Sequence, residues 1–194
     1  MSKKTAIQVL MVFLIFLISL SLYLKYFNES SKLSKVNTSI KKVNVDENSS
    51  STYIENINYA SSDAKGNKYQ ITATKAEISI ESSDVMFLDN VIAYIFIKDS
   101  DTIKITSDFG KYNSKNYDTI FSKNVIVVYP GHEITGDYLD FSFLSSLGTI
   151  STDVIYTGDN MNLFADKIEI NLITKDTKIF MHDNTKKVLV EGTK

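Results

Sequence analysis

A short motif that recurs four times is the feature that most constrains how this 194-residue chain can fold. The motif resembles T-x-D-x-G-x-Y, and its third residue falls at Thr74, Asp108, Asp137 and Asp166, so the spacings are 34, 29 and 29 residues. A second half-motif follows each copy at a similar interval, beginning at Phe87, Phe121, Ile150 and Phe180. A period near 30 residues indicates that one supersecondary unit is stacked and that no unit buries its apolar face alone. The repeat favours an extended binding scaffold over an enzyme with a pocket.

From Tyr53 onward the chain is typical of short strands, because β-branched and aromatic residues alternate with polar ones between turn residues. In each repeat the apolar residues switch once between odd-numbered and even-numbered positions. Ile71 and Ala73 occupy odd positions, for example, whereas Ala76 and Ile78 occupy even ones. Side chains alternate faces along a strand, so a change of parity requires a bulge or a sharp bend. Aligned bends predict two sheets that meet along a crease with a trough between them. An irregular β-sandwich is the alternative fold.

An almost uninterrupted apolar run extends from Ile7 to Leu24, and an aromatic end follows it. As a helix, these 18 residues would reach roughly 27 Å, close to the hydrocarbon thickness of a bilayer. The run exceeds the usual length of a signal-peptide core, which favours a retained anchor over a cleaved leader. The lysines on its two sides do not decide the orientation, but a short leader before a long domain is typical of an exported C-terminus. The sequence therefore predicts four parts: a cytoplasmic leader 1–6, a transmembrane helix 7–27, a linker 28–52 and a periplasmic β domain 53–194.

Composition argues against several classes of function. All 21 basic residues are lysine, and the arginine fork used to read phosphate and guanine is absent, which argues against sequence-specific nucleic-acid binding. The chain contains no cysteine, which excludes disulfides and thiolate metal sites. No glycine-rich phosphate loop is present. We therefore expect no enzyme activity and no cofactor.

Candidate chemical groups are few. His132 follows Pro-Gly in a predicted turn, and His182 precedes Asp-Asn in another, so we expect both histidines at the surface rather than in a metal or triad site. Asp108, Asp137 and Asp166 recur with the repeat but lack the glycine-rich spacing of calcium-binding repeats. Side-chain hydrogen bonds at the crease are their expected role.

The repeats resemble those of a known family. The Ile-Thr-Ala-x-x-Ala-Glu segment at 71–77, the Gly-Lys-Tyr-Asn element at 110–113 and the Asn-Val pairs at 90–91 and 124–125 are similar to the OstA-like repeats of the LptC family. That family is the bitopic inner-membrane component of the bacterial lipopolysaccharide-export bridge. The resemblance implies an all-β, twisted, open, V-shaped β-jelly roll behind one transmembrane helix, with lipid acyl chains held in its interior. It also implies that open strand edges dock to neighbouring jelly-roll domains.

Two sets of residues follow as candidate sites. Residues that recur in the repeats are the candidates to line an apolar trough, in which burial of about 0.8 kcal/mol per methylene would drive lipid binding. They are Ile71, Phe87, Ile105, Phe109, Phe121, Tyr138, Phe141, Phe164 and Phe180. The first and last strands are the candidate edges for strand addition to a partner. Their residues are Tyr53, Ile54, Ile57, Val188, Leu189 and Val190.

The expected function is transport of lipopolysaccharide from the inner toward the outer membrane. The chain would receive the lipid from the permease subunits of an inner-membrane ABC transporter and pass it to a periplasmic jelly-roll bridge protein. Its expected location is the inner membrane, as a single-pass protein with its C-terminal domain in the periplasm. The alternatives are a structural tether that transfers no lipid and a soluble, LptA-like relay with a cleaved leader.

Overall fold

The computed structural model describes Leu14, Ser19 and the ranges 42–45 (backbone only), 51–62, 66–79, 82–183, 185 and 187–192. The chain divides into two compact units, Met1–Lys35 and Val36–Lys194. Within the described part of the chain, no helix has both the length and the apolar character needed to cross a membrane. Apart from Leu14 and Ser19, the predicted helix at 7–27 lies outside the described residues.

The second unit is built from β-strands, as the sequence predicts. Eight long strands of eleven or twelve residues lie between shorter ones at the two ends of the series. The strands are β1 (Lys42–Val45), β2 (Ser51–Ser62), β3 (Lys68–Ser79), β4 (Val85–Phe96), β5 (Thr102–Asn113), β6 (Thr119–Tyr129), β7 (His132–Ser142), β8 (Leu147–Gly158), β9 (Met161–Asn171), β10 (Thr177–Phe180) and β11 (Leu189–Gly192). Strand β1 lies within the range that the sequence assigned to the linker.

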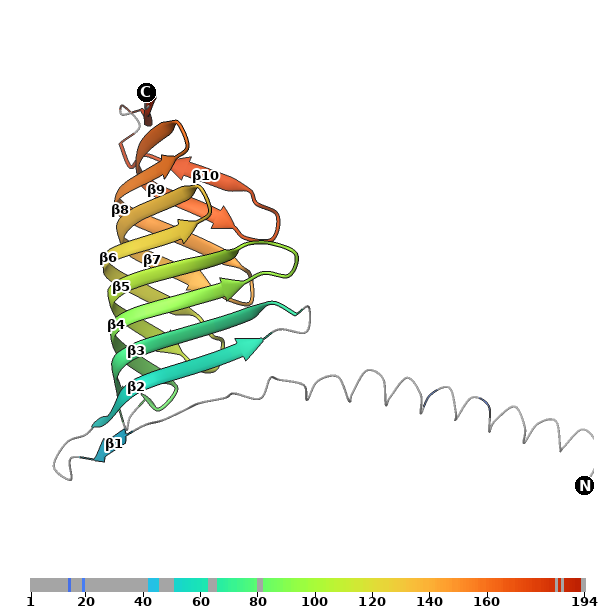
Figure 1. Cartoon of the computed structure of the whole chain (residues 1–194), viewed down its shortest axis with the longest axis vertical. Helices are drawn as coiled ribbons and strands as arrows, with labels where there is room; N and C mark the ends of the chain where they lie inside the picture. The colour runs from blue at the N-terminus through green and yellow to red at the C-terminus, as the bar shows by residue number, and fades with distance from the viewer. Residues whose placement is uncertain are drawn as a thin grey trace, which may run out of the picture. The chain divides into compact units, whose positions relative to one another are not determined.

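All eleven strands form one antiparallel sheet in which each strand from β1 to β10 pairs with the next along the chain (Figure 1). The exception is β11, which pairs with β9 beside β10. Strand β9 therefore carries β10 along Lys167–Ile170 and β11 along Met161–Phe164. This simple up-and-down order gives an open, jelly-roll-like sheet that folds over on itself.

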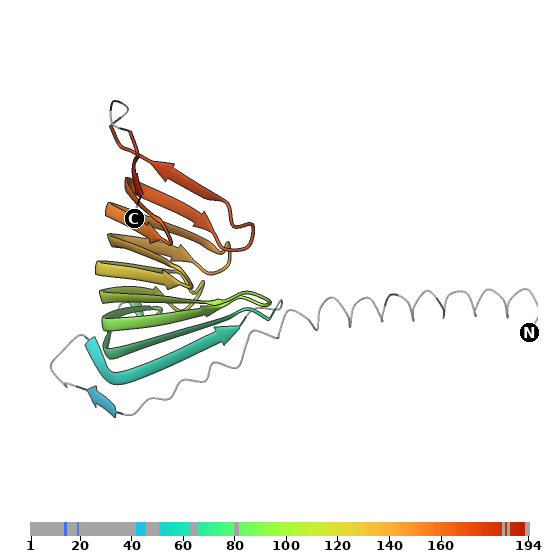
Figure 2. The same ribbon diagram turned by 45° about the horizontal axis from the view of Figure 1, so that its top comes forward.

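The crease predicted from the parity change is confirmed. In β3 the buried residues Ala73 and Ala76 are three positions apart, and Leu88 and Val91 have the same separation in β4, although plain alternation would give an even number. The reversal occurs at aligned positions in neighbouring strands, so every long strand bends in the same place (Figure 2). We call the half of the sheet that contains Ser51–Glu55 the first wall, and the half that contains Ile57–Ser62 the second wall.

Left-handed backbone conformations produce the bends. Asn56 and Asn90 each have φ of 52° at the crease of β2 and β4. Strands β6 and β8 carry an extra residue there, and their pairing registers shift by one on both sides. In β6 the bulge is Lys123 and Asn124, with φ of 61° and 50°, and in β8 Thr152 and Asp153 occupy the equivalent place. A β-bulge of this kind bends the strand and reverses the faces of the side chains beyond it.

Small residues alternate with large ones along the inside of the crease. A Cβ atom added at Gly110 of β5 would lie 3.0 Å from Val91 Cγ2, and one added at Gly136 of β7 would lie 3.0 Å from Ile150 Cγ1. The even-numbered strands thus supply branched side chains, and the odd-numbered strands leave room for them. This alternation lets the two walls approach closely where they meet.

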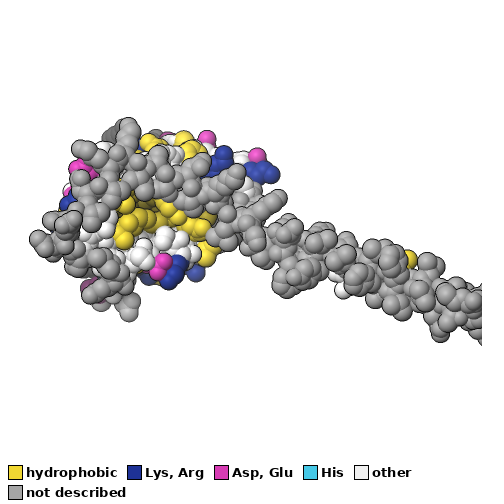
Figure 3. Space-filling view, turned by 90° about the horizontal axis from the view of Figure 1, so that it is seen from below, with side chains coloured by type: hydrophobic (Ala, Val, Ile, Leu, Met, Phe, Trp, Pro, Cys, Tyr) yellow, Lys and Arg dark blue, Asp and Glu magenta, His cyan; other side chains and the backbone are white. Residues whose placement is uncertain are grey.

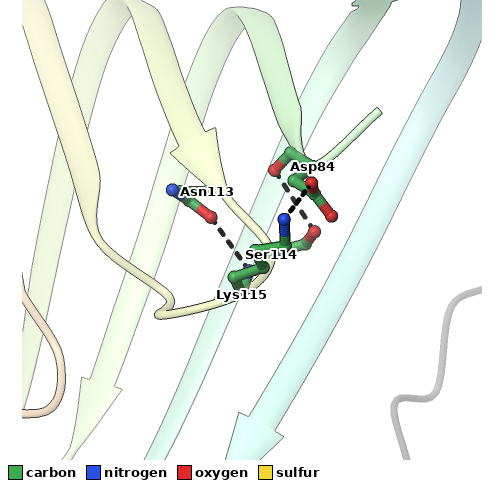
Figure 4. Close-up of polar contacts among 4 residues, drawn as sticks. All are labelled: Asp84, Asn113, Ser114 and Lys115. Carbon is green, nitrogen blue, oxygen red and sulfur yellow. Dashed lines mark hydrogen bonds and ion pairs between the residues drawn. The ribbon is translucent and has the colours of Figure 1, made fainter. Parts of the chain in front are cut away.

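Turns at the outer rim of the first wall are tied to one another by polar contacts (Figure 4). The backbone nitrogen of Ser114 donates to the carbonyl oxygen of Asp84 at 2.8 Å, and Lys115 Nζ lies 2.6 Å from Asp84 Oδ2. The backbone nitrogen of Lys115 donates to Asn113 Oδ1 at 2.9 Å. These contacts join the β5–β6 turn to the residue that precedes β4.

Candidate functional site

An open apolar cavity of about 330 Å³ lies between the two walls. One side is formed by the second wall and its turns, from Ile97 in the β4–β5 turn to Tyr156 in β8. The opposite side is the β9–β10 hairpin of the first wall, which includes Ile170 and Leu172. The lining residues are Ile97, Ser100, Ile103, Val127, Tyr129, His132, Ile134, Tyr156, Ile170, Asn171, Leu172, Lys175 and Thr177.

A narrower space of about 40 Å³ continues this cavity toward the crease. The two spaces share five aliphatic lining residues: Ile103, Val127, Ile134, Ile170 and Leu172. The inner space then reaches Phe141 and Ile150, which are nearly fully buried. The cavity thus runs from an open mouth into the core and is apolar along its depth.

The hydrophobic interior is also visible from the β2 end of the domain. Hydrophobic side chains gather in the hollow seen from below in Figure 3, and lysine and acidic side chains lie around it. Strand β2 contributes the buried residues Ile54 and Ile57 to this interior. The apolar surface therefore extends along the stack of strands rather than forming one isolated pocket.

Polar groups cluster at the mouth of the cavity. His132 Nδ1 lies 2.6 Å from Tyr156 Oη, and the His132 ring stacks between Tyr129 and Tyr156, with centroid separations of 6.0 and 5.7 Å. Lys175 lines the opposite side of the mouth. An apolar interior with a few polar groups at its entrance is the usual composition of a site for an amphipathic ligand.

An aromatic cluster fills the interior between the β2 end and the cavity. The Tyr69 ring lies 5.8 Å from both Phe141 and Phe143, and the Tyr69 hydroxyl is hydrogen-bonded to Thr119 Oγ1 at 3.0 Å. Tyr59 packs edge-on against Tyr112 at 5.0 Å. Burial raises the pKa of Tyr69 and of Tyr112 well above the ordinary tyrosine value, so both are neutral at any physiological pH. The cluster meets the cavity at Phe141, which lines its narrow part.

The structure brings four of the nine predicted trough residues into the interior. Ile71, Ile105, Phe121 and Phe141 are all nearly fully buried. Ile105 and Phe141 line the narrow part of the cavity.

The other five lie on the outer surface of the sheet and are not brought together with the interior group. Phe87, Phe109 and Tyr138 are 50%, 44% and 38% exposed. Phe164 is half-buried and faces outward, because Leu163 and Ala165 on either side of it are buried. Phe180 is also half-buried, and it shares the outward face of its partner Lys167, which precedes the buried Ile168. Lysine ammonium groups lie over several of these rings, including Lys111 over Phe87 at 5.9 Å and Lys123 over Phe109 at 5.3 Å.

Sequence reasoning missed most of the residues that line the cavity mouth, including Ile134, Tyr156, Ile170 and Leu172. The spacing of apolar residues was the available signal. Ile168, Ile170 and Leu172 occupy every second position and therefore share one face of β9 and of the residue just beyond it. His132, expected at the surface, is exposed, and it lies at the mouth of the cavity.

The predicted edge residues have mixed positions. Tyr53 and Ile54 pair with β1 through Asn44 and Val43, so a strand already lies outside this part of β2. Past Glu55, no partner strand flanks the outer edge of β2 within the part of the chain that the structure describes. Ile57, on this segment, is buried. At the other end of the sheet, Leu189 and Val190 of β11 are more than half exposed, whereas Val188 is half-buried.

The described residues hold no group of three or more histidine, cysteine, aspartate or glutamate side chains placed to bind a metal ion. The site geometry is that of a hydrophobic channel with a polar rim.

Comparison with known families identifies the group of proteins to which this channel belongs. A family model described as "Lipopolysaccharide-assembly, LptC-related" matches residues 11–180.

The chain belongs to the LptC family.

No curated protein matches this LptC-family chain closely enough to refine the assignment. LptC is a component of lipopolysaccharide transport that is anchored in the inner membrane, and it is not known as an enzyme family. This LptC-family chain therefore takes part in lipopolysaccharide transport, in company with other components of that machinery.

Proposed function

We propose that the interior of this LptC-family domain binds the acyl chains of lipopolysaccharide. The observation that carries the proposal is the open apolar cavity between the second wall and the β9–β10 hairpin, with a volume of about 330 Å³. Burial of each methylene contributes about 0.8 kcal/mol, so a saturated chain supplies the binding energy without any charged group deep in the site.

The size of the cavity suggests how binding proceeds. At about 30 Å³ for a group the size of a water molecule, a chain of roughly a dozen carbons would occupy a volume similar to that of the cavity. A lipid with several chains needs more space than this. We therefore propose that the two walls separate at their open rim when the lipid binds, while the crease stays closed.

The polar mouth suits the other end of the ligand. Lys175 and His132 lie at the entrance, where the phosphorylated sugars of the lipid would remain in contact with water. Lysine binds phosphate as a point charge and needs no fixed fork geometry. This arrangement supports an orientation with the acyl chains inward and the headgroup at the rim.

In the transport pathway, we propose that the chain receives lipopolysaccharide from the permease subunits of an ABC transporter and passes it to a periplasmic jelly-roll protein. Residues 7–27 would form the single membrane-spanning helix, and the domain from residue 53 onward would lie in the periplasm. Strand addition at the two ends of the sheet would join the interior of one domain to that of the next. The short strands β1, β10 and β11 are the candidate contact points.

Site-specific photo-crosslinking tests the binding proposal. A photoreactive amino acid at Ile134, which lines both parts of the cavity, should form adducts with lipopolysaccharide in the full chain. The same amino acid at Phe109, which is 44% exposed on the outer face, serves as the matched control and should form few adducts. Equal labelling at the two positions, or none at Ile134, would contradict the proposal.

A cavity-filling variant separates lipid transfer from a purely structural tether. Val127 is half-buried and lines both parts of the cavity, so Val127→Phe should occupy space that the acyl chain needs. We expect crosslinking from Ile134 and transfer of lipid to the next component to fall together, with an unchanged far-ultraviolet circular dichroism spectrum. Normal transfer by a folded, blocked variant would favour the tether.

A further inference from the structure

Two side-chain hydroxyl groups are buried in the interior without a hydrogen-bond partner. Tyr112 Oη, on β5 of the first wall, and Ser61 Oγ, on β2 of the second wall, have no partner among the described residues. Tyr112 is fully buried, and Ser61 is 5% exposed. Buried polar groups are nearly always paired in folded proteins, so each exception needs a physical reason.

The two hydroxyl groups face the same part of the interior from opposite walls. Tyr59 lies two residues before Ser61 and therefore shares its face of β2. The Tyr59 ring packs edge-on against the Tyr112 ring, with the centroids 5.0 Å apart. Tyr69 is the direct neighbour of Ser61 in the pairing register. Thr119 is the direct neighbour of Tyr112. The Tyr69 and Thr119 hydroxyls are hydrogen-bonded to each other at 3.0 Å, so the two unpaired groups flank a pair that is already satisfied.

One row on the inner face of the first wall connects these hydroxyls with the cavity. Tyr112 and Thr119 supply the only polar side chains on the row between Ile78 and Ile170, and Thr119 is paired. The β2 end of the row is half-buried, and its other end lines the narrow part of the cavity. Its members are direct neighbours from β3 to β9: Ile78, Met86, Tyr112, Thr119, Phe141, Gly148 and Ile170. An acyl chain that follows this row meets one unpaired hydroxyl, that of Tyr112.

We infer that Tyr112 binds a hydroxyl group carried by an acyl chain, so that the interior selects hydroxylated acyl chains over plain ones. This inference rests on the proposed function, because the lipid must enter the interior for its chains to reach β5. A ligand hydroxyl both donates and accepts a hydrogen bond, and it can therefore complete the bonding of Tyr112 or of Ser61. The carbons on either side of that hydroxyl contact the apolar members of the row.

The chemistry of the site explains the selection. Burial of a hydroxyl group in a purely apolar cavity is unfavourable, because the group loses its hydrogen bonds to water. Tyr112 and Ser61 offset this cost for a hydroxylated chain, whereas a plain chain leaves both groups unpaired. A site that forms a hydrogen bond with a ligand hydroxyl discriminates against the analogue that lacks it.

Two half-buried side chains next to Tyr112 lie toward the β2 end. Tyr59 packs against its ring, and Met86 is its direct neighbour on β4. Methionine is unbranched and adapts its shape readily to a new neighbour. We expect these two side chains to move when an acyl chain enters from the β2 end.

Internal competition between two fatty acids tests the selection. The full chain, held in an amphipathic polymer, carries a diazirine amino acid at Met86 and receives an equal mixture of myristate and β-hydroxymyristate. We expect roughly tenfold more adduct with the hydroxylated acid, as a buried hydrogen bond would give, and no preference in the Tyr112→Phe variant. The same amino acid at Phe87, the next residue and 50% exposed on the outer face, is the matched control and should show no preference. Equal adducts at Met86, as expected if water alone pairs with Tyr112, or no adducts there, would overturn the inference.

Stability measurements distinguish the hydroxyl group from the packing of the ring. Tyr112→Phe removes an unpaired buried hydroxyl, so the urea midpoint should stay the same or rise. Tyr69→Phe breaks the bond to Thr119, so it should lower the midpoint but keep the preference for β-hydroxymyristate. An equal loss of preference in both variants would show that the aromatic packing decides the selection and would overturn the role of Tyr112.

Lipopolysaccharide adducts at Ile134 report on the proposed function separately. Adducts at Ile134 without a preference at Met86 would leave the proposed function standing and overturn only the selection by Tyr112. A preference at Met86 without adducts at Ile134 would support the hydroxyl site and contradict the proposed function.

Discussion

Asn124 donates a hydrogen bond from its side-chain nitrogen to Asp108 Oδ2 across the crease, at a distance of 2.7 Å. The two residues are sixteen positions apart, and the same separation joins Asn90 to Thr74 at 3.1 Å. A third contact with this separation runs from the backbone nitrogen of His182 to Asp166 Oδ2 at 2.7 Å. The prediction that the recurring aspartates form hydrogen bonds at the crease is thus confirmed for Asp108 and Asp166.

The fourth position of this series is different. Asp137 would be expected to pair with residue 153, sixteen positions further on, but that residue is also an aspartate and has no hydrogen to donate. No side-chain hydrogen bond to Asp137 is present among the described residues. Side-chain hydrogen bonds of this series therefore cross the crease before β7, at Asp108, and after β8, at Asp166, but not between β7 and β8.

This contrast gives the first prediction. Asp108→Ala removes a hydrogen bond to a charged group and should lower the free energy of unfolding by about 1 kcal/mol. Asp137→Ala removes no such bond, so its effect should be close to zero. Urea denaturation of the full chain, followed by the near-ultraviolet circular dichroism of its tyrosines, measures both. Equal destabilisation by the two variants would show that the Asn124–Asp108 bond has no special role.

The inner side of the crease gives the second prediction. An added methyl group at Gly136 would lie 3.0 Å from Ile150 Cγ1 and 3.3 Å from the backbone oxygen of Ser151, so Gly136→Ala should destabilise the domain by about 1–3 kcal/mol. At Gly148 the nearest atom is 3.7 Å away, an ordinary contact, and alanine there should be neutral or mildly stabilising.

A second-site change can verify the cause. Because Ile150 is the side chain that the new methyl group would meet, Ile150→Val should recover part of the stability lost in Gly136→Ala. The same urea titration shows this as a rise in the midpoint of the double variant over Gly136→Ala alone. No recovery would locate the strain in the backbone of Ser151 instead.

Backbone strain in β8 gives the third prediction. Thr152 has φ of 70°, a left-handed conformation that is unfavourable for a β-branched residue. Thr152→Asn should stabilise the domain by about 1 kcal/mol, because asparagine tolerates this conformation. Thr149→Asn is the control on the same strand: Thr149 is not among the residues with positive φ, and asparagine there should be neutral or destabilising. A Thr152→Asn variant with unchanged thermal stability would contradict the prediction.

The buried tyrosines give the fourth prediction, which concerns pH. Burial raises the pKa of Tyr69 and Tyr112 in the folded chain. When the pH exceeds about 10, the unfolded chain ionises these tyrosines and the folded chain does not, so their contribution to stability declines as pH rises. Each tyrosine should lower the free energy of unfolding by up to about 1.4 kcal/mol per pH unit in this range.

Phenylalanine variants separate this effect from the titration of lysines at similar pH. We expect the double variant Tyr69→Phe, Tyr112→Phe to lose less stability between about pH 9 and about pH 11 than the unmodified chain does. Urea midpoints at the two pH values provide the measurement. Identical losses for the two proteins would show that neither tyrosine governs the alkaline transition.

Much of the fold could be predicted from the sequence because its signals are local and repeated. The parity change around Ala73 and Ala76 is visible in the sequence, and it marks the crease correctly. Strand β1 could not be foreseen, since four residues give little periodicity and its pairing with Thr52–Glu55 depends on the folded edge of β2.

The candidate site was harder to predict because hydrophobicity alone does not specify a face. Phe87 and Phe109 are aromatic and recur with the repeat, yet the reversal at the crease turns them outward. Lysine ammonium groups lie over both rings, and this cation–π attraction makes the exposure of the rings less costly. Ile134 and Ile170 are ordinary aliphatic residues in sequence, and only the closure of the two walls reveals that they face the same cavity.

The alternation of small and branched residues inside the crease has a consequence for how such domains vary in length. Gly110 and Gly136 belong to odd-numbered strands, whereas Val91 and Ile150 belong to even-numbered ones. Insertion of one strand would set two branched rows side by side at the narrowest point, but insertion of a complete hairpin would preserve the order. Related chains should therefore differ by whole hairpins, so that the length available to a lipid changes in steps of two strands.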